Sequence, residues 1–148
     1  MRVSAKGEYA IKALLDLALH EGAGLRPIQE IAEHQGIPQR YLEQVLLQLK
    51  RAGFLQSRRG STGGYRLSRA ADQVTVGAVL RAVDGSTGMG EPARRGGGRG
   101  RSEHVGDLGG LWQEVSAAVS AVVDRVTLED LRLRAEARRR DARPMYHI

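Results

Sequence analysis

Apolar and polar positions alternate with helical spacing through the first third of the chain. After Ser4 the apolar residues keep mostly to one face of a helix until two glycines interrupt the pattern. A second helix is predicted after Pro27 and ends at Gly36, and a third begins near Pro38 and ends at Gly53. A short helix, a glycine turn and a longer helix are typical of a helix-turn-helix, although helical hairpins with glycine turns are also common elsewhere.

Two short strand-like segments enclose a glycine-rich turn directly after these helices. The segments are residues 54–57 and 65–67, and the stretch "RRGSTGGYRL" runs through the turn. A phosphate-binding P-loop would need a lysine, then Ser or Thr and a helix, after its last glycine, whereas Tyr65 and a strand-like segment follow Gly64 here. We therefore expect a β-hairpin, or wing, whose glycines allow a phosphate chain to come close.

A long apolar stripe occupies the last third of the chain. Its members recur every three or four residues and are Leu108, Leu111, Trp112, Val115, Val119, Val122 and Val126. Because the preceding domain uses its own helices to build a core, we expect this helix to pack against its copy in a twofold homodimer. The alternative is that it folds back on its own domain. A short capped helix should follow up to residue 135, and residues 136–148 are predicted to be a mobile tail.

Basic residues are concentrated in the predicted helix-turn-helix and wing. The chain has a formal net charge of +6 and a pI near 10.3, and residues 38–69 carry seven basic side chains against Glu43 alone. Residues 1–37 carry four basic and five acidic side chains. A basic surface favours a nucleic acid or an anionic membrane as partner. No apolar run of about 18 residues is present to cross a membrane, so we expect a cytoplasmic protein that binds DNA and no membrane.

The composition limits the remaining possibilities. The 148 residues, of which 41% are hydrophobic, are enough for one domain with an oligomerising extension. The chain contains no cysteine, which excludes disulfides, a thiolate nucleophile and a thiolate-held zinc or iron–sulfur centre. Four scattered histidines without clustered carboxylates give no visible acid–base or nucleophilic constellation. We therefore expect no enzyme activity and no cofactor.

Three stretches resemble the Rrf2 family of bacterial winged-helix transcription regulators. They are "VSAKGEYAIKALLDLA", "IQEIAEHQGIPQRYLEQVLLQLKRAGFLQSRRGSTGGYRLSR" and "VTVGAVLRAVDG", and they cover most of residues 1–85. The resemblance implies a mainly α fold with a small β-hairpin: a winged helix-turn-helix domain over residues 1–84, followed by a long dimerisation helix. It also implies a sequence-specific regulator, and we expect a homodimeric repressor on a palindromic operator in double-stranded DNA. A non-specific architectural nucleic-acid binder is the alternative.

The resemblance also implies which residues contact DNA. They are Gln39, Arg40, Tyr41, Glu43 and Gln44 at the start of the recognition helix, and Arg58, Arg59, Gly60, Ser61, Thr62, Gly63 and Gly64 in the wing. Arg59 would enter the minor groove, and Arg, Gln and Glu side chains are suited to reading base edges. Two alternatives remain open: Tyr41 and Leu42 can belong to the core, and Glu43 can pair with Arg40 or Lys50 on the helix surface.

Residues 85–107 form a predicted flexible loop that is rich in glycine and arginine. In the sensing members of the family this region carries three cysteines that hold an iron–sulfur cluster, and this chain departs from that pattern. Other possible metal ligands are Glu8 in the first helix and Glu91, Glu103, His104 and Asp107 in the loop. Their irregular spacing favours a solvated loop over a metal site. The arginines of the loop can contact DNA phosphates or an acidic partner, or stay disordered. An effector, whether a protein or a small metabolite, cannot be identified from these residues.

Overall fold

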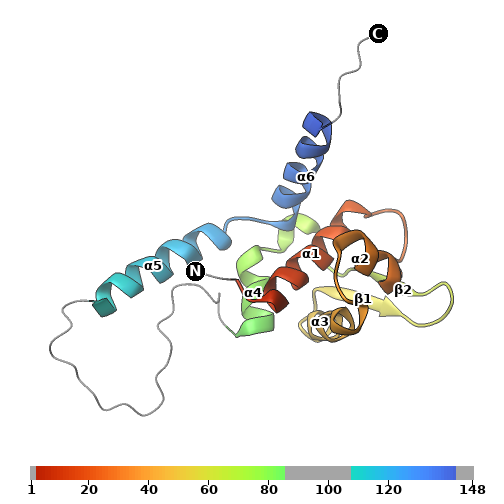
Figure 1. Ribbon diagram of the computed structural model, residues 1–148, viewed down its shortest axis with the longest axis horizontal. Coiled ribbons are helices and arrows are strands. Elements are labelled where there is room, and N and C mark those ends of the chain that lie inside the picture. Colours follow the sequence, from red (N-terminus) through yellow and green to blue (C-terminus); the bar gives the residue numbers. More distant parts are fainter. Residues whose placement is uncertain (1–2, 86–107, 143–148) are drawn as a thin grey trace, which may run out of the picture.

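Four helices and a β-hairpin form the body of the protein, and two further helices follow it (Figure 1). The structure, a computed structural model, describes residues 3–85 and 108–142. The elements are α1 (Ala5–Leu19), α2 (Ile28–Gln35), α3 (Gln39–Arg51), β1 (Leu55–Arg58), β2 (Gly64–Leu67), the 3₁₀ turn η1 (Ala71–Gln73), α4 (Val76–Asp84), α5 (Leu108–Val123) and α6 (Leu128–Ala142). The fold is mainly helical with a single hairpin in the described ranges, as predicted.

Helix α1 lies at the centre of the body. The Ser4 side chain caps it by accepting a hydrogen bond from the Gly7 amide at 2.9 Å, which confirms the predicted start. Its inner face, which includes Ala10, Leu14 and Leu17, is almost completely buried. Helices α2, α3 and α4 all contact α1, so the core forms around this helix.

The predicted helix-turn-helix is formed by α2 and α3. Gly36 ends α2 in the left-handed conformation with φ 65°, which is the role expected of a glycine at this position. Helix α3 buries one face in the core through Leu42, Val45, Leu46 and Leu49, and leaves the opposite face exposed. The periodicity of apolar residues therefore fixes which side of α3 is available to a partner.

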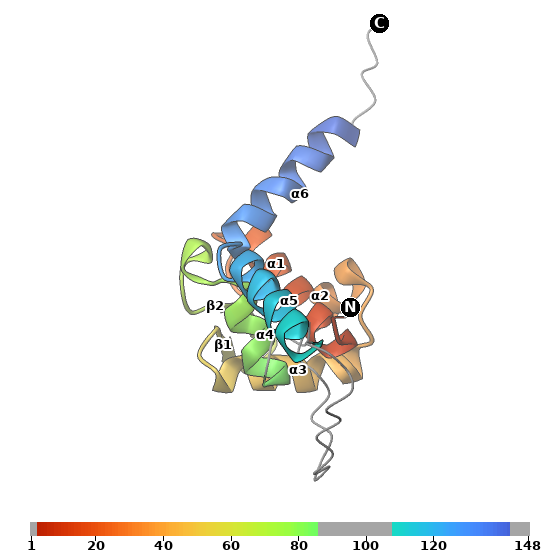
Figure 2. The same ribbon diagram turned by 90° about the vertical axis from the view of Figure 1, so that its left-hand side faces the viewer.

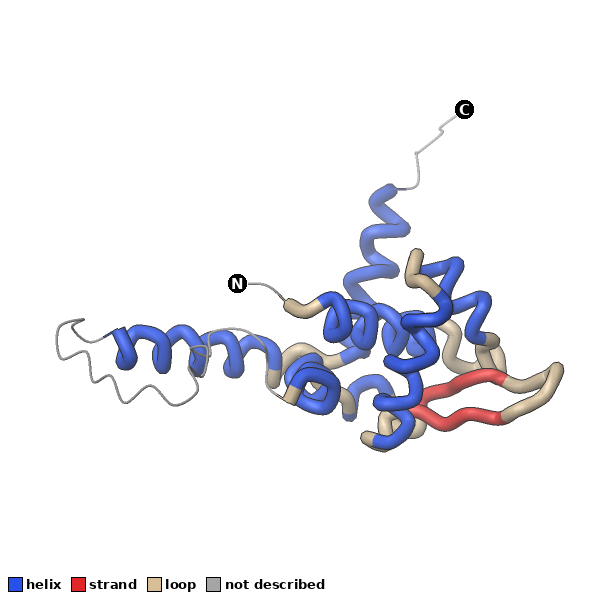
Figure 3. Tube along the Cα trace, turned by 60° about the horizontal axis from the view of Figure 1, so that its bottom comes forward, coloured by secondary structure: helices blue, strands red, loops and turns tan. Residues whose placement is uncertain are grey.

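The wing is an antiparallel hairpin with a third segment paired to it. In the β1–β2 register Leu55 lies opposite Leu67 and Arg58 opposite Gly64. Arg26, in the connection between α1 and α2, forms a two-way backbone bridge with Tyr65, with both N–O distances 2.9 Å. The wing is thereby joined to the segment that leads into α2, and it lies at the opposite end of the molecule from α5 (Figure 3).

Helix α5 leaves the body, and part of it packs back on its own chain. Val119 and Val123 are 9% and 7% exposed and contact Leu80 of α4. Val119 was predicted to lie in a dimer interface; within one chain it already packs against α4, because it is near the end of α5 that returns to the body. The fold-back alternative is thus correct for this end of the helix.

Helix α6 begins inside the core and then extends away from the body (Figure 2). Leu128 is fully buried among residues of the N-terminal domain, and its amide donates to the Val74 carbonyl at 2.9 Å. A capping box joins Thr127 and Asp130, as the sequence predicted. The core of the N-terminal domain is therefore completed by a residue beyond the predicted boundary at residue 84.

The terminal helix is longer than expected. Residues 136–142 were predicted to belong to a mobile tail but are helical. The segment is rich in Ala, Arg and Glu, which favour helix even without an apolar stripe, and Arg132 forms ion pairs with Glu129 and Glu136 one turn away on either side. The predicted loop from residue 86 to 107 and the last six residues lie outside the described residues. No helix in the described ranges is long and apolar enough to cross a membrane.

Candidate nucleic-acid interface

The outer face of α3 carries most of the predicted base-reading side chains. Gln39, Arg40, Glu43 and Gln44 are all exposed. Helical spacing places them opposite the buried stripe of the same helix, so burial of that stripe orients them toward solvent. In the part of the chain that the structure describes, Glu43 forms no ion pair with Arg40 or Lys50, which leaves its carboxylate available to accept a hydrogen bond.

Tyr41 and Leu42 differ from these neighbours. Leu42 is fully buried, so the core alternative is correct for it. Tyr41 is 38% exposed, and its ring contacts the edge of the Tyr9 ring with centroids 5.4 Å apart. The Tyr41 side chain is therefore held against α1, and only part of it faces outward.

The tip of the wing is exposed. Arg58, Arg59, Ser61 and Thr62 face solvent around a turn in which the Gly63 amide donates to the Gly60 carbonyl at 3.0 Å. Gly60 has φ 114°, and a Cβ added there would meet nothing within 4 Å. This glycine alone among the three leaves open space beside the backbone, where a phosphate chain can approach.

The other two glycines of the turn are required by contacts inside the protein. A Cβ on Gly63 would overlap the Arg58 carbonyl oxygen, and a Cβ on Gly64 would overlap that of Arg26. Gly64 is also buried and has φ 153°. These two glycines allow close backbone packing of the wing, and their predicted approach to a phosphate chain stays a prediction.

A groove of about 600 Å³ separates α3 from the wing. The α3 side presents Glu43, Leu47 and Lys50, and the wing side presents Arg58 and Arg59. Three basic side chains against one acidic side chain make the groove suitable for a phosphate backbone. Leu47, which the sequence analysis did not select, is 46% exposed here and can contact a thymine methyl group or a sugar.

A buried carboxylate in α1 lies behind the candidate interface and links the elements that carry it. Asp16 of α1 is completely buried and accepts hydrogen bonds from Arg26 at 3.1 Å, His34 at 2.6 Å and Gln35 at 3.3 Å. Burial by itself raises the pKa of the Asp16 carboxyl, but these hydrogen bonds outweigh it and hold the pKa below the ordinary value. Because Arg26 also bonds Glu30 at 2.7 Å, one network joins α1, the bridge to the wing and α2.

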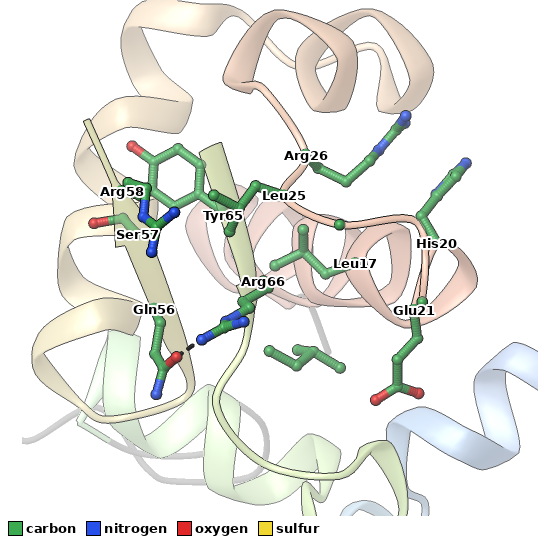
Figure 4. A pocket seen from close by; sticks show the side chains of 13 residues that line it. Leu17, His20, Glu21, Leu25, Arg26, Gln56, Ser57, Arg58, Tyr65 and Arg66 are labelled. Carbon is green, nitrogen blue, oxygen red and sulfur yellow. Dashed lines mark hydrogen bonds between the residues drawn. The ribbon is translucent and has the colours of Figure 1, made fainter. Parts of the chain in front are cut away.

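A second cavity, of about 400 Å³, lies between the α1–α2 connection and the two strands. Figure 4 shows Tyr65 and Arg66 of β2 on one side and His20 and Arg26 on the other. Arg66 donates a hydrogen bond to Gln56 across the hairpin at 3.1 Å, so its charge is directed along the strands. This cavity could not be predicted from the sequence, because its walls come from segments about forty residues apart.

The predicted dimerisation stripe is only partly covered within the chain. Val115 and Val126 are half-buried, whereas Leu108, Leu111, Trp112 and Val122 are 44–46% exposed. Exposed apolar side chains that gather on one projecting helix are uncommon on a monomer and mark an interaction surface.

A family model and individual relatives agree on the proteins that this chain resembles in sequence. A family profile named Rrf2 and described as "Iron-dependent Transcriptional regulator" matches residues 3–133. The HTH-type transcriptional regulator IscR of Sodalis glossinidius (strain morsitans) is 42% identical over 135 residues, which is 88% of this chain and 78% of the relative. IscR of Erwinia tasmaniensis has the same identity and coverage.

Solved structures are similar over most of the chain. IscR of T. potens has a TM-score of 0.73 and 32% identity, with 91% of this chain and 88% of that chain covered. CymR (YrzC), the global cysteine regulator of B. subtilis, has a TM-score of 0.72 and 31% identity, with 89% and 96% covered.

Proposed function

The chain belongs to the Rrf2 family of DNA-binding transcription regulators, which are not enzymes, and we propose that it is a homodimeric repressor of a palindromic operator that works without an iron–sulfur cluster. Repression follows if the bound dimer covers a promoter. Such a protein works on the chromosome, in the cytoplasm of a bacterium.

The observation that carries this proposal is the pairing of an exposed recognition face with an exposed basic wing tip. Gln39, Arg40, Glu43 and Gln44 offer donors and acceptors suited to base edges in the major groove. Arg59 extends from the wing beside Gly60, where it suits the negative potential of a narrow minor groove. Lys50 and Arg58 line the same groove and would contact phosphates, which contribute affinity without sequence choice.

The uncovered part of α5 supports the dimer. Leu108, Leu111 and Trp112 are exposed and lie at the start of α5. Helix α5 lies on the side of the molecule away from the wing (Figure 3). Pairing of two such helices about a twofold axis would bury these side chains. It would also present two recognition helices to successive major grooves, about 34–36 Å apart, which requires a palindromic site.

The residues present do not fit an iron–sulfur cluster, which is the cofactor of the sensing members of the family. Such clusters are held by cysteine thiolates, and this chain has none. We therefore derive no step of regulation from a cluster, and any effector acts through another part of the protein.

Selection of genomic fragments by the purified protein, at two salt concentrations, tests the proposal. A palindromic motif enriched at both salts is expected, because base contacts persist when counterion-driven binding weakens. Binding that vanishes at the higher salt without yielding a motif would favour the architectural alternative and refute the proposal.

Substitution of the wing arginine tests the contact residues on the selected site. Arg59→Ala should weaken operator binding by about 1–3 kcal/mol. Arg140→Ala removes the same charge from the exposed distal part of α6 and serves as the matched control. Equal affinities of the two variants would contradict the assignment of Arg59.

A further inference from the structure

Two histidines and a buried aspartate meet at the ends of α1 and α2. Asp16, His20 and His34 each offer one ligand atom such that all three atoms lie within 4.8 Å of one another. The two imidazole rings are 5.4 Å apart between centroids and inclined by 71°. Eighteen residues separate Asp16 from His34, so only the packing of α2 on α1 brings them together.

The hydrogen bonds of the two rings determine which nitrogen carries the proton. The Nδ1 atom of His20 lies 2.8 Å from the Asp16 backbone carbonyl, which can only accept, so this Nδ1 must donate. The Nδ1 atom of His34 lies 2.6 Å from Asp16 Oδ1, and an ionised carboxylate likewise only accepts. Each neutral ring therefore keeps an unprotonated Nε2 with a free lone pair.

We propose that His20 and His34 bind one first-row transition-metal ion through their Nε2 atoms, with Asp16 orienting both rings. A histidine that donates its other nitrogen to a carboxylate or a backbone carbonyl is the arrangement found behind metal-bound imidazoles. The Asp16 oxygens are occupied by Arg26, His34 and Gln35, so the carboxylate acts as the orienting group. Water completes the coordination.

Exposure and chemistry select the class of ion. The side chains of His20 and His34 are 28% and 43% exposed, which lets an ion reach them, whereas the Asp16 side chain is fully buried. Imidazole suits Zn²⁺, Cu²⁺, Ni²⁺ and Co²⁺, whereas Ca²⁺ and Mg²⁺ require several oxygen ligands. No metal was expected from the sequence, because nothing in the spacing of these three residues indicates that they meet.

A metal ion at this position would be linked through protein contacts to the proposed DNA-binding face. His34 lies in the last turn of α2, two residues before Gly36, and His20 ends α1. Asp16 also holds Arg26, whose backbone pairs with Tyr65 of the wing. An ion that joins the two helix ends therefore restrains the elements that position α3 and the wing. This consequence rests on the proposed function, whereas metal binding itself does not.

Titration of the tag-free full-length protein with Co²⁺, Ni²⁺ and Cu²⁺, without DNA, tests the site. One ion per chain is expected, with affinity rising in that order. His20→Ala should weaken binding by at least about tenfold, and the double variant His104→Ala/His147→Ala, which removes the other two histidines of the chain, should bind as the wild type does.

A second variant separates loss of a ligand from loss of the fold. His34→Arg keeps a donor for the Asp16 carboxylate but cannot bind the ion, so it should fold normally by circular dichroism and bind no metal. The site is refuted if the wild type binds no ion at millimolar metal. It is also refuted if His20→Ala or His34→Arg retains wild-type affinity, or if the double variant loses binding.

Discussion

Substitution of Gly64 by alanine tests how the wing is joined to the body. The new Cβ would overlap the Arg26 carbonyl oxygen and lie 3.0 Å from the Pro27 nitrogen, both of which are backbone atoms. Neither atom can be moved by rotating a side chain. We therefore expect the segment at Arg26 to separate from β2.

The magnitude of the destabilisation can be worked out from two contributions. Gly64 has φ 153°, a conformation that costs a residue with a side chain about 1–3 kcal/mol. Separation of the segments breaks the two hydrogen bonds between Arg26 and Tyr65, each with a net contribution of about 0.5–1.5 kcal/mol. The free energy of unfolding should therefore fall by about 2–6 kcal/mol, a large share of the stability of a small domain.

Gly60→Ala is the matched control for this measurement. Gly60 also has a positive φ, of 114°, but a Cβ there meets nothing within 4 Å, so only the conformational cost applies. Urea denaturation of both variants should show the larger loss for Gly64→Ala, together with weaker operator binding. Equal losses of stability in the two variants would refute the argument that backbone contact with Arg26 makes Gly64 necessary.

Three further predictions concern the core, the network and the α5 surface. Leu128→Ala should lower the free energy of unfolding by about 2–5 kcal/mol in urea, because Leu128 is fully buried in the core of the DNA-binding domain. The folded-state pKa of Asp16 lies below its ordinary value of 3.8. The carboxylate therefore contributes its full stabilisation above pH 3.8, and this contribution is lost as the pH falls through the folded-state pKa. Asp16→Asn should remove this acid-dependent loss of stability from urea denaturation curves recorded at a series of pH values. Trp112→Glu should yield a folded monomer in analytical ultracentrifugation, whereas Val119→Glu should destabilise the monomer itself, because Val119 is buried against α4.

The helix-turn-helix and the wing were predictable because their signals are local. The apolar stripe of α3 and the glycine turn at Gly36 are read from residues that are close together in sequence. The hairpin was likewise indicated by strand-like residues on both sides of a glycine-rich turn, with strand limits correct to about one residue. The exposed residues of α3 then followed from helical period alone.

Long-range packing was not predictable in the same way. Nothing near Leu128 indicates that it fills the core, because the residues it contacts belong to the first 83 positions of the chain. The same limit applies to Val119, which lies in a regular apolar stripe whose members face two different surroundings. A stripe shows that a helix face needs to be covered, but not which part of the molecule covers it.

The buried network around Asp16 joins the wing to α2. Arg26 pairs through its backbone with the wing and through its side chain with Asp16 and Glu30, so one residue contributes to the placement of both β2 and α2. Burial of the Asp16 carboxylate is costly unless its partners remain in place, and His34 is one of those partners. A substitution of His34 is therefore expected to weaken the hydrogen bond between Asp16 and Arg26. Because the backbone of Arg26 pairs with Tyr65, the position of the wing would change as well. The network thereby connects a solvent-accessible imidazole to the wing, one of the two elements proposed to contact DNA.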